Sequence, residues 1–164
     1  MTKKIMLIAA IVAASFYVVS CGKGTETTNT ICTNTPVTND SAALVNFAAA
    51  NNITVTKDAS GMYYQIVSAG TGSTYPNSNS LVEVTYKGTL LNGTVVDSTV
   101  AGKTASFYLY QLIAGWQIGI PKIKAAGRIK LLIPSALAYG CQGSGTRVPA
   151  NTPIYFDVTL VSFQ

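Results

Sequence analysis

The only tryptophan of this 164-residue chain lies in a short apolar segment, "QLIAGWQIGI" at residues 111–120. Trp116 stands between Gly115 and Gly119, so the largest side chain is placed where its neighbours are smallest. Such a ring either completes a hydrophobic core or forms the floor of a pocket that holds an apolar group. These residues alone leave both interpretations open.

Covalent and metal chemistry have few candidate residues here. The chain has no histidine, which excludes a Ser-His-Asp triad, a Cys-His pair and any histidine metal ligand within it. Its three cysteines, Cys21, Cys32 and Cys141, cannot form a four-thiolate zinc site on their own. We therefore expect no metal and no cofactor.

The basic residues give no support for nucleic-acid binding. The formal charge is +5, and two of these charges belong to Lys3 and Lys4 in a segment that we expect to be removed. The cations at positions 122, 124, 128 and 130 alternate with apolar residues, which indicates a solvated face. With no basic block and no binding motif, we expect no nucleic-acid partner.

The first residues have the features of an export signal. "MTKK" is cationic, and the apolar stretch 5–19 has the length of a signal-peptide core but is short for a membrane span. "VVSC" at residues 18–21 resembles a bacterial lipobox. We expect a lipoprotein signal peptide over 1–20 and lipid on Cys21, anchoring the protein to a bacterial membrane, on the periplasmic face of the outer membrane. The alternative is an ordinary secretory signal in which Cys21 is incidental.

Export would place the remaining cysteines in an oxidising compartment. Cys32 and Cys141 can then form a disulfide. Alternatively, Cys141 is a small buried apolar residue. The sequence does not show whether the two come within bonding distance.

Composition divides the rest of the chain. Residues 21–39 are rich in Thr and Asn and poor in large apolar groups, which predicts a flexible tether. A helical extension is predicted over 40–54, where Asp40 or Ser41 can cap a helix with Leu44, Phe47 and Ala48 on one face.

Strand patterns follow the predicted helix. Apolar and polar residues alternate over 61–72, 81–91, 105–110, 127–134 and 153–163, and "NGT" at 92–94 is typical of a hairpin turn. A single helical segment interrupts them at about 113–121, where Ile113, Trp116 and Ile120 have helical spacing. The sequence predicts an α+β domain, an antiparallel sheet wrapped around one short helix.

Four motifs in order now carry a family resemblance: "VEVTYKGTLLNGTVVDST", "QLIAGWQIGI", "RIKLLIPSALAYG" and "VPANTPIYFDVTLVSF". Over residues 55–164 the chain resembles the FKBP-type peptidyl-prolyl isomerase family, and its N-terminal part is similar to FKBP-type lipoproteins of the Bacteroidetes. The resemblance implies a strongly twisted antiparallel sheet curled over a short helix, with a pocket between them. It also implies catalysis of cis/trans rotation about the bond that precedes proline.

The resemblance places a set of site residues in this sequence. It implies catalytic roles for Tyr86, Asp97 and Tyr139. It implies a substrate-binding wall, with Trp116 as the pocket floor, formed by Phe107, Leu112, Ile113, Trp116, Val148 and Phe156. The implied partners are proline-containing unfolded or exported polypeptides.

Rotation about this bond has a barrier of about 18–20 kcal/mol and breaks no covalent bond. A dry aromatic pocket favours the twisted amide, which has lost resonance and charge separation, over either planar form. The hydroxyl of Tyr139 can hold the substrate carbonyl, and Asp97 either orients a partner group or contacts the carbonyl carbon.

Several positions depart from the family pattern. Val96 and Ala105 stand where aromatic residues are common, Arg147 replaces an apolar residue, and Pro121 should shorten or kink the helix. No arginine follows Asp97 in "STVAGK", 98–103, so Asp97 is expected to be less firmly held. We expect a wider, less aromatic pocket with reduced activity on small peptides and weaker binding of macrolide inhibitors. The alternative function is a chaperone module that binds proline-containing segments with little or no turnover.

Overall fold

The computed structural model describes residues 32–164, so the predicted signal peptide and the lipid attachment site at Cys21 lie outside the described residues. Within 32–164, no helix is long and apolar enough to cross a bilayer.

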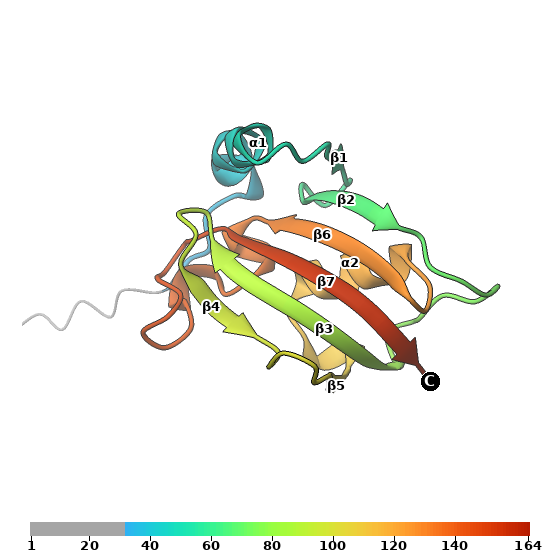
Figure 1. The fold of residues 1–164 in the computed structure, drawn as a ribbon. Coiled ribbons are helices and arrows are strands. Elements are labelled where there is room, and N and C mark those ends of the chain that lie inside the picture. The colour runs from blue at the N-terminus through green and yellow to red at the C-terminus, as the bar shows by residue number, and fades with distance from the viewer. Residues whose placement is uncertain (1–31) are drawn as a thin grey trace, which may run out of the picture. The chain divides into compact units, whose positions relative to one another are not determined.

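A twisted, seven-stranded antiparallel sheet forms the body of the domain (Figure 1). Six strands lie in the order β1-β2-β6-β7-β3-β4, and β5 also pairs with β3. The strands are β1 (Thr56–Lys57), β2 (Tyr63–Ser68), β3 (Leu81–Leu90), β4 (Val95–Ser98), β5 (Ala105–Tyr108), β6 (Gly127–Ile133) and β7 (Ile154–Phe163). The sheet and its short helix confirm the predicted α+β class.

Alternation along the strands gives the sheet an apolar inner face, as the sequence predicts. Val82 and Val84 of β3 are fully buried, as are every second residue of β6 and most inner residues of β7. The β3–β7 pairing runs from Val82 opposite Phe163 to Leu90 opposite Ile154, so these inner residues form continuous rows across the central strands.

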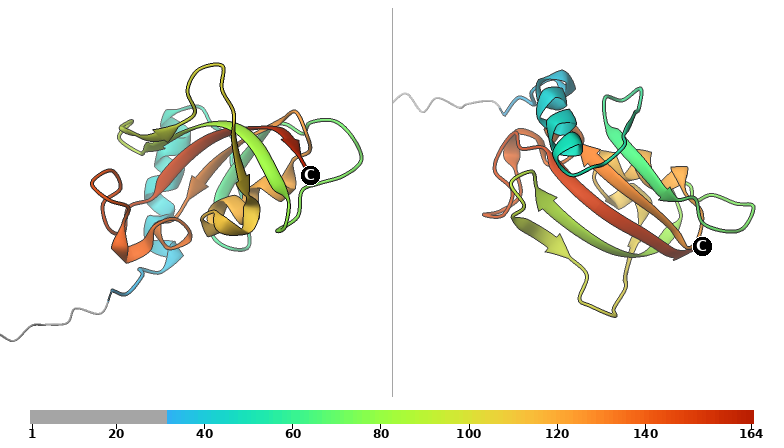
Figure 2. Two further views of the ribbon diagram at one scale, coloured as in Figure 1. Left: turned by 90° about the horizontal axis from the view of Figure 1, so that it is seen from below. Right: turned by 45° about the horizontal axis from the view of Figure 1, so that its top comes forward.

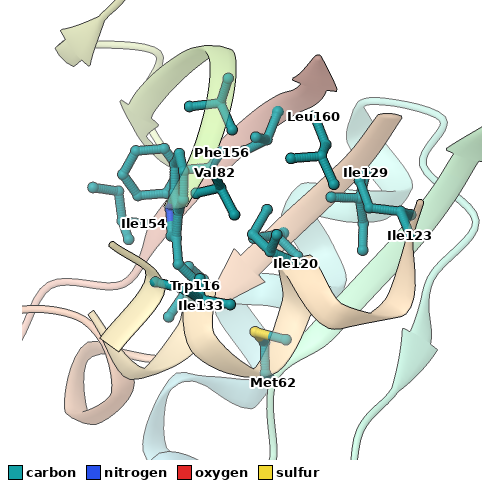
Figure 3. Close-up of a cluster of buried hydrophobic side chains, with 14 of the residues drawn as sticks. Met62, Val82, Trp116, Ile120, Ile123, Ile129, Ile133, Ile154, Phe156 and Leu160 are labelled. Atoms are coloured by element: carbon teal, nitrogen blue, oxygen red, sulfur yellow. The ribbon is translucent and has the colours of Figure 1, made fainter. Parts of the chain in front are cut away.

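Helix α2 (Ala114–Gly119) packs on this inner face (Figure 3). A side-chain carbon at Gly115 would collide with Ile133, and one at Gly119 with Leu131, so the two glycines let the helix approach β6 closely. The α-helix ends at Gly119, and Pro121 lies in a 3-10 turn over Ile120–Lys122. Pro121 therefore limits the helix as expected, because it cannot donate a backbone hydrogen bond.

Helix α1 (Ser41–Ala50) packs against the opposite face of the sheet, beside β2 and β6 (Figure 2). Leu44 and Ala48 are buried against Tyr63 and Leu132, whose neighbours in β2 and β6 point to the inner core. The predicted helical face is confirmed. The prediction that the Asp40 side chain caps the helix is wrong, because its carboxylate accepts a hydrogen bond from Ser135 instead.

Residues 32–39, the part of the predicted tether that the structure describes, are attached to the domain. A disulfide joins Cys32 to Cys141, whose Cα atoms are 5.5 Å apart, and Asn34 accepts a hydrogen bond from the Cys141 amide. Residues 32–39 are therefore fastened to the domain, because a covalent bond and hydrogen bonds hold a segment whose apolar content alone would not order it.

Candidate functional site

A cavity of about 220 Å³ opens between the inner face of the sheet and helix α2. Its lining residues are Tyr86, Asp97, Phe107, Gln111, Leu112, Ile113, Trp116, Tyr139 and Phe156. Eight of the nine predicted site residues therefore line one cavity, and five of its nine lining residues are aromatic.

Trp116 forms the floor of the cavity and is only 3% exposed. The rings of Tyr86 and Phe156 each stand nearly perpendicular to the indole, with centroids 5.3 Å away (Figure 3 shows Trp116 beside Phe156). Edge-to-face packing of this kind fixes the aromatic rings relative to one another. Trp116 thus belongs to the hydrophobic core and also lines the cavity.

Strand pairing brings Asp97 and Phe156 to the same part of the cavity. Asp97 lies opposite Gly88, and Gly88 lies opposite Phe156 on its other side. A side chain at Gly88 would overlap the Phe156 ring, so glycine gives that ring its space.

A β-bulge next to this row directs the acidic side chain. The register between β3 and β4 shifts after the Gly88–Asp97 pair. Val96 is the extra residue of the bulge, so the consecutive Val96 and Asp97 can both face the inner side, Val96 in the core and Asp97 on the cavity wall.

The carboxylate of Asp97 is held by two donors. The Tyr86 hydroxyl donates to Oδ2 at 2.7 Å, and the Ser98 amide donates to Oδ1 at 2.9 Å. Burial, followed by the hydrogen bond to Asp97, raises the pKa of Tyr86 far above its usual value. Tyr86 is therefore a neutral hydrogen-bond donor at any physiological pH.

Tyr139 forms the opposite polar wall. It is half-buried, and its hydroxyl makes no hydrogen bond with another residue of 32–164. Burial, with a smaller effect from the charge of Asp97, raises its pKa. A protonated hydroxyl with no partner in the described chain is free to donate to a carbonyl oxygen of a bound molecule.

One predicted residue is not part of the cavity wall. Val148 is 3% exposed and packs within the inner core, although the preceding Arg147 reaches β4, where its Nη1 lies 3.4 Å from the Val96 carbonyl. Gln111 lines the cavity and was not predicted; a solvent-exposed polar residue between strand and helix gives no signal of its own.

The two positions with missing aromatic rings lie off the cavity wall. Val96 is in the core, and Ala105 is at the start of β5 and is not a lining residue.

Within residues 32–164, no cluster of acidic and sulfur ligands could hold a metal ion. The arrangement offers an aromatic floor, an oriented carboxylate and an uncommitted hydroxyl, which suits the binding of a compact apolar ring attached to an amide.

Comparisons with known proteins show which family the chain resembles. The model of the FKBP-type peptidyl-prolyl cis-trans isomerase family matches residues 72–161. The chain is 42% identical over 106 residues to the FKBP-type peptidyl-prolyl cis-trans isomerase FkpA of Aeromonas hydrophila, covering 64% of this chain and 39% of that protein. A probable FKBP-type isomerase of Haemophilus influenzae is 40% identical over 70% of this chain and 47% of its own length. The chain thus spans less than half the length of these curated relatives.

Solved structures show the same fold. The crystal structure of FkpA from Escherichia coli superposes with a TM-score of 0.68 and 35% identity, covering 78% of this chain and 61% of that one. A peptidyl-prolyl cis-trans isomerase from Pseudomonas syringae superposes with a TM-score of 0.65 and 29% identity, covering 80% of this chain and 98% of that one.

Proposed function

The chain belongs to the FKBP-type peptidyl-prolyl cis-trans isomerase family, and we propose that it accelerates cis/trans rotation about Xaa-Pro bonds. The observation that carries this proposal is the cavity over Trp116, where aromatic rings, Asp97 and Tyr139 converge. The spontaneous rotation takes tens to hundreds of seconds, slow enough to limit the folding of a polypeptide.

The cavity can lower the barrier by binding the twisted amide more tightly than either planar isomer. Twisting removes amide resonance and with it part of the charge separation, so the rotating bond is less polar than its ground states. The apolar rings over Trp116 replace water around that bond and hold the proline ring in one orientation.

The two polar walls fix the rest of the substrate. The Tyr139 hydroxyl donates to a substrate carbonyl oxygen, which keeps one side of the bond stationary while the other rotates. Asp97, held by Tyr86 and Ser98, presents its charge at the cavity edge and orients the substrate backbone.

Binding without turnover is the alternative, and two measurements separate it from catalysis. Isomerisation is measured by a protease-coupled or NMR exchange assay, and binding by the fluorescence of Trp116, the chain's single tryptophan. Catalysis requires that the protein shorten the exchange time of a proline peptide. A protein that binds the peptide and leaves the exchange time unchanged is a binding module.

The substrates that we propose are proline-containing segments of exported proteins, encountered by a protein anchored through lipid on Cys21. Eleven peptide steps separate Cys21 from Cys32, which gives a maximum reach of about 40 Å between the bilayer and the domain. Mass spectrometry of the mature N-terminus tests the anchor. An unmodified Cys21, or a cleavage site elsewhere, would contradict it.

A further inference from the structure

The segment that carries Tyr139 is held from outside by residues 32–40. Strand β6 ends at Ile133, and the chain then passes through two short 3-10 turns, Ser135–Leu137 and Gly140–Gln142, with Tyr139 between them. Tyr139 itself has φ −106° and ψ 0°, outside the helix and strand regions. Its position therefore depends on how the turns on either side are fixed.

The turn after Tyr139 is fixed by Cys32 and Asn34. The disulfide joins Cys32 to Cys141, and the Asn34 side-chain oxygen accepts the Cys141 amide at 2.9 Å. Gly140 has φ +56°, and a side-chain carbon there would collide with the Asn34 carboxamide. Asn34 therefore packs directly on the backbone next to Tyr139.

The turn before Tyr139 is fixed by Asp40. Its Oδ2 accepts hydrogen bonds from both the amide and the hydroxyl of Ser135, each at 2.7 Å, and both residues are buried. The Thr35 and Ser135 hydroxyls lie 3.3 Å apart. Buried hydrogen bonds to a charged carboxylate are among the strongest that a side chain makes.

The turns around Tyr139 depend on the contacts with residues 32–40 because Tyr139 borders two open spaces. Besides the cavity over Trp116, Tyr139 lines a second, polar hollow of about 380 Å³ together with Cys32, Asn34 and Gln142. The Tyr139 ring packs against the inner core on one side only, so core packing alone does not set its position.

We propose that residues 32–40 are positioning residues for the isomerase reaction, and that the Cys32–Cys141 disulfide makes the position of Tyr139 dependent on oxidation. This inference rests on the proposed function, since Tyr139 there holds the substrate carbonyl. Cys32 is exposed and Cys141 half-buried, so a soluble dithiol can reach the bond. Reduction transfers two electrons and two protons to the cysteines and leaves the dithiol as its cyclic disulfide.

The test uses the full chain, solubilised in mild detergent, before and after dithiothreitol treatment, with the gain of two thiols verified. Two quantities are measured: kcat/KM on a proline peptide, and the NMR signals of ¹³C-labelled tyrosine rings, with that of Tyr139 assigned through Tyr139→Phe. Reduction is expected to lower kcat/KM roughly five- to tenfold, the effect of one weakened neutral hydrogen bond, mainly through kcat. The Tyr139 signal is expected to shift and broaden.

Variants separate positioning from general stability. Cys32→Ser with Cys141→Ser should match the reduced protein and show no response to dithiothreitol. Asn34→Ala should lower kcat/KM, and Asn34→Asp, which keeps the acceptor oxygen, should restore it. Leu44→Ala is the matched control, because it loosens helix α1 without touching Ser135 or Cys141; its Tyr139 signal should stay unchanged while the protein is folded.

A reduced protein with full kcat/KM and an unchanged Tyr139 signal would overturn the inference. If the oxidised protein has no isomerase activity, the proposed function fails. The Tyr139 signal then still decides whether residues 32–40 position this ring.

Discussion

The Tyr86 hydroxyl donates a 2.7 Å hydrogen bond to Oδ2 of Asp97, joining β3 to β4 at the edge of the cavity. The same Tyr86 ring stands on the Trp116 indole, so a single residue couples the cavity floor to its acidic wall. The loop after Asp97 has no arginine, and Tyr86 with the Ser98 amide holds the carboxylate instead.

Tyr86→Phe should keep the ring on Trp116 and release Asp97. We expect kcat/KM on a proline peptide to fall by about three- to tenfold, corresponding to about 0.7–1.4 kcal/mol, since Asp97 loses one of its two donors and keeps the Ser98 amide. Tyr155→Phe is the matched control, because its hydroxyl lies 3.5 Å from Asp157, away from the cavity. Equal loss in the two variants, or no loss in Tyr86→Phe, would show that the Tyr86–Asp97 bond has no part in the reaction.

Gly115→Ala should destabilise the protein although alanine favours helices over glycine. The added methyl group would overlap Ile133, and overpacking of a core costs about 1–3 kcal/mol, more than the gain of up to about 1 kcal/mol in helix propensity. Urea unfolding measures the difference. An unfolding free energy equal to or above that of the wild type would mean that α2 has room to move away from β6.

The ion pair between Asp58 and Lys122 predicts a pH-dependent contribution to stability. Lys122 ends the turn after α2, and its Nζ lies 2.7 Å from Oδ2 of Asp58. The hydrogen bond from Lys122, with that from the Ser60 amide, lowers the pKa of Asp58 from 3.8 to about 2. Because the folded-state pKa is the lower one, the contribution is present above about pH 4 and is lost as the pH falls towards 2.

Asp58→Asn should therefore lower the free energy of unfolding near pH 7 by no more than about 1 kcal/mol, because both side chains are partly exposed. The difference from the wild type should shrink as the pH falls through about 4 to 2. Urea unfolding over that range checks it. A difference that stays constant with pH would assign the loss to a cause other than the charge of Asp58.

The strands and the cavity could be predicted because their signals are local or carried by motifs. Alternation in 81–91 and 153–163 follows directly from burial on one face of the sheet. The motif order located eight cavity residues, although it also placed Val148 on the wall when that side chain turns into the core.

The contacts that span the chain could not be predicted. The position of Asp40 before an apolar helical pattern predicted a helix cap. Nothing in the local sequence indicates that its carboxylate bonds to Ser135, 95 residues away. The pairing of Cys32 with Cys141 stayed open for the same reason. The β-bulge that turns both Val96 and Asp97 to the inner side depends on the pairing with β3, which the sequence of β4 does not reveal.

The most direct test measures cis/trans exchange and peptide binding on the same samples of wild type, Tyr139→Phe and Asp97→Ala, with binding followed by Trp116 fluorescence. We predict that the wild type accelerates exchange and that each variant still binds but loses about tenfold in kcat/KM, corresponding to about 1.4 kcal/mol of transition-state stabilisation. A wild-type protein that binds the peptide at the Trp116 cavity and leaves its exchange rate unchanged would contradict the account.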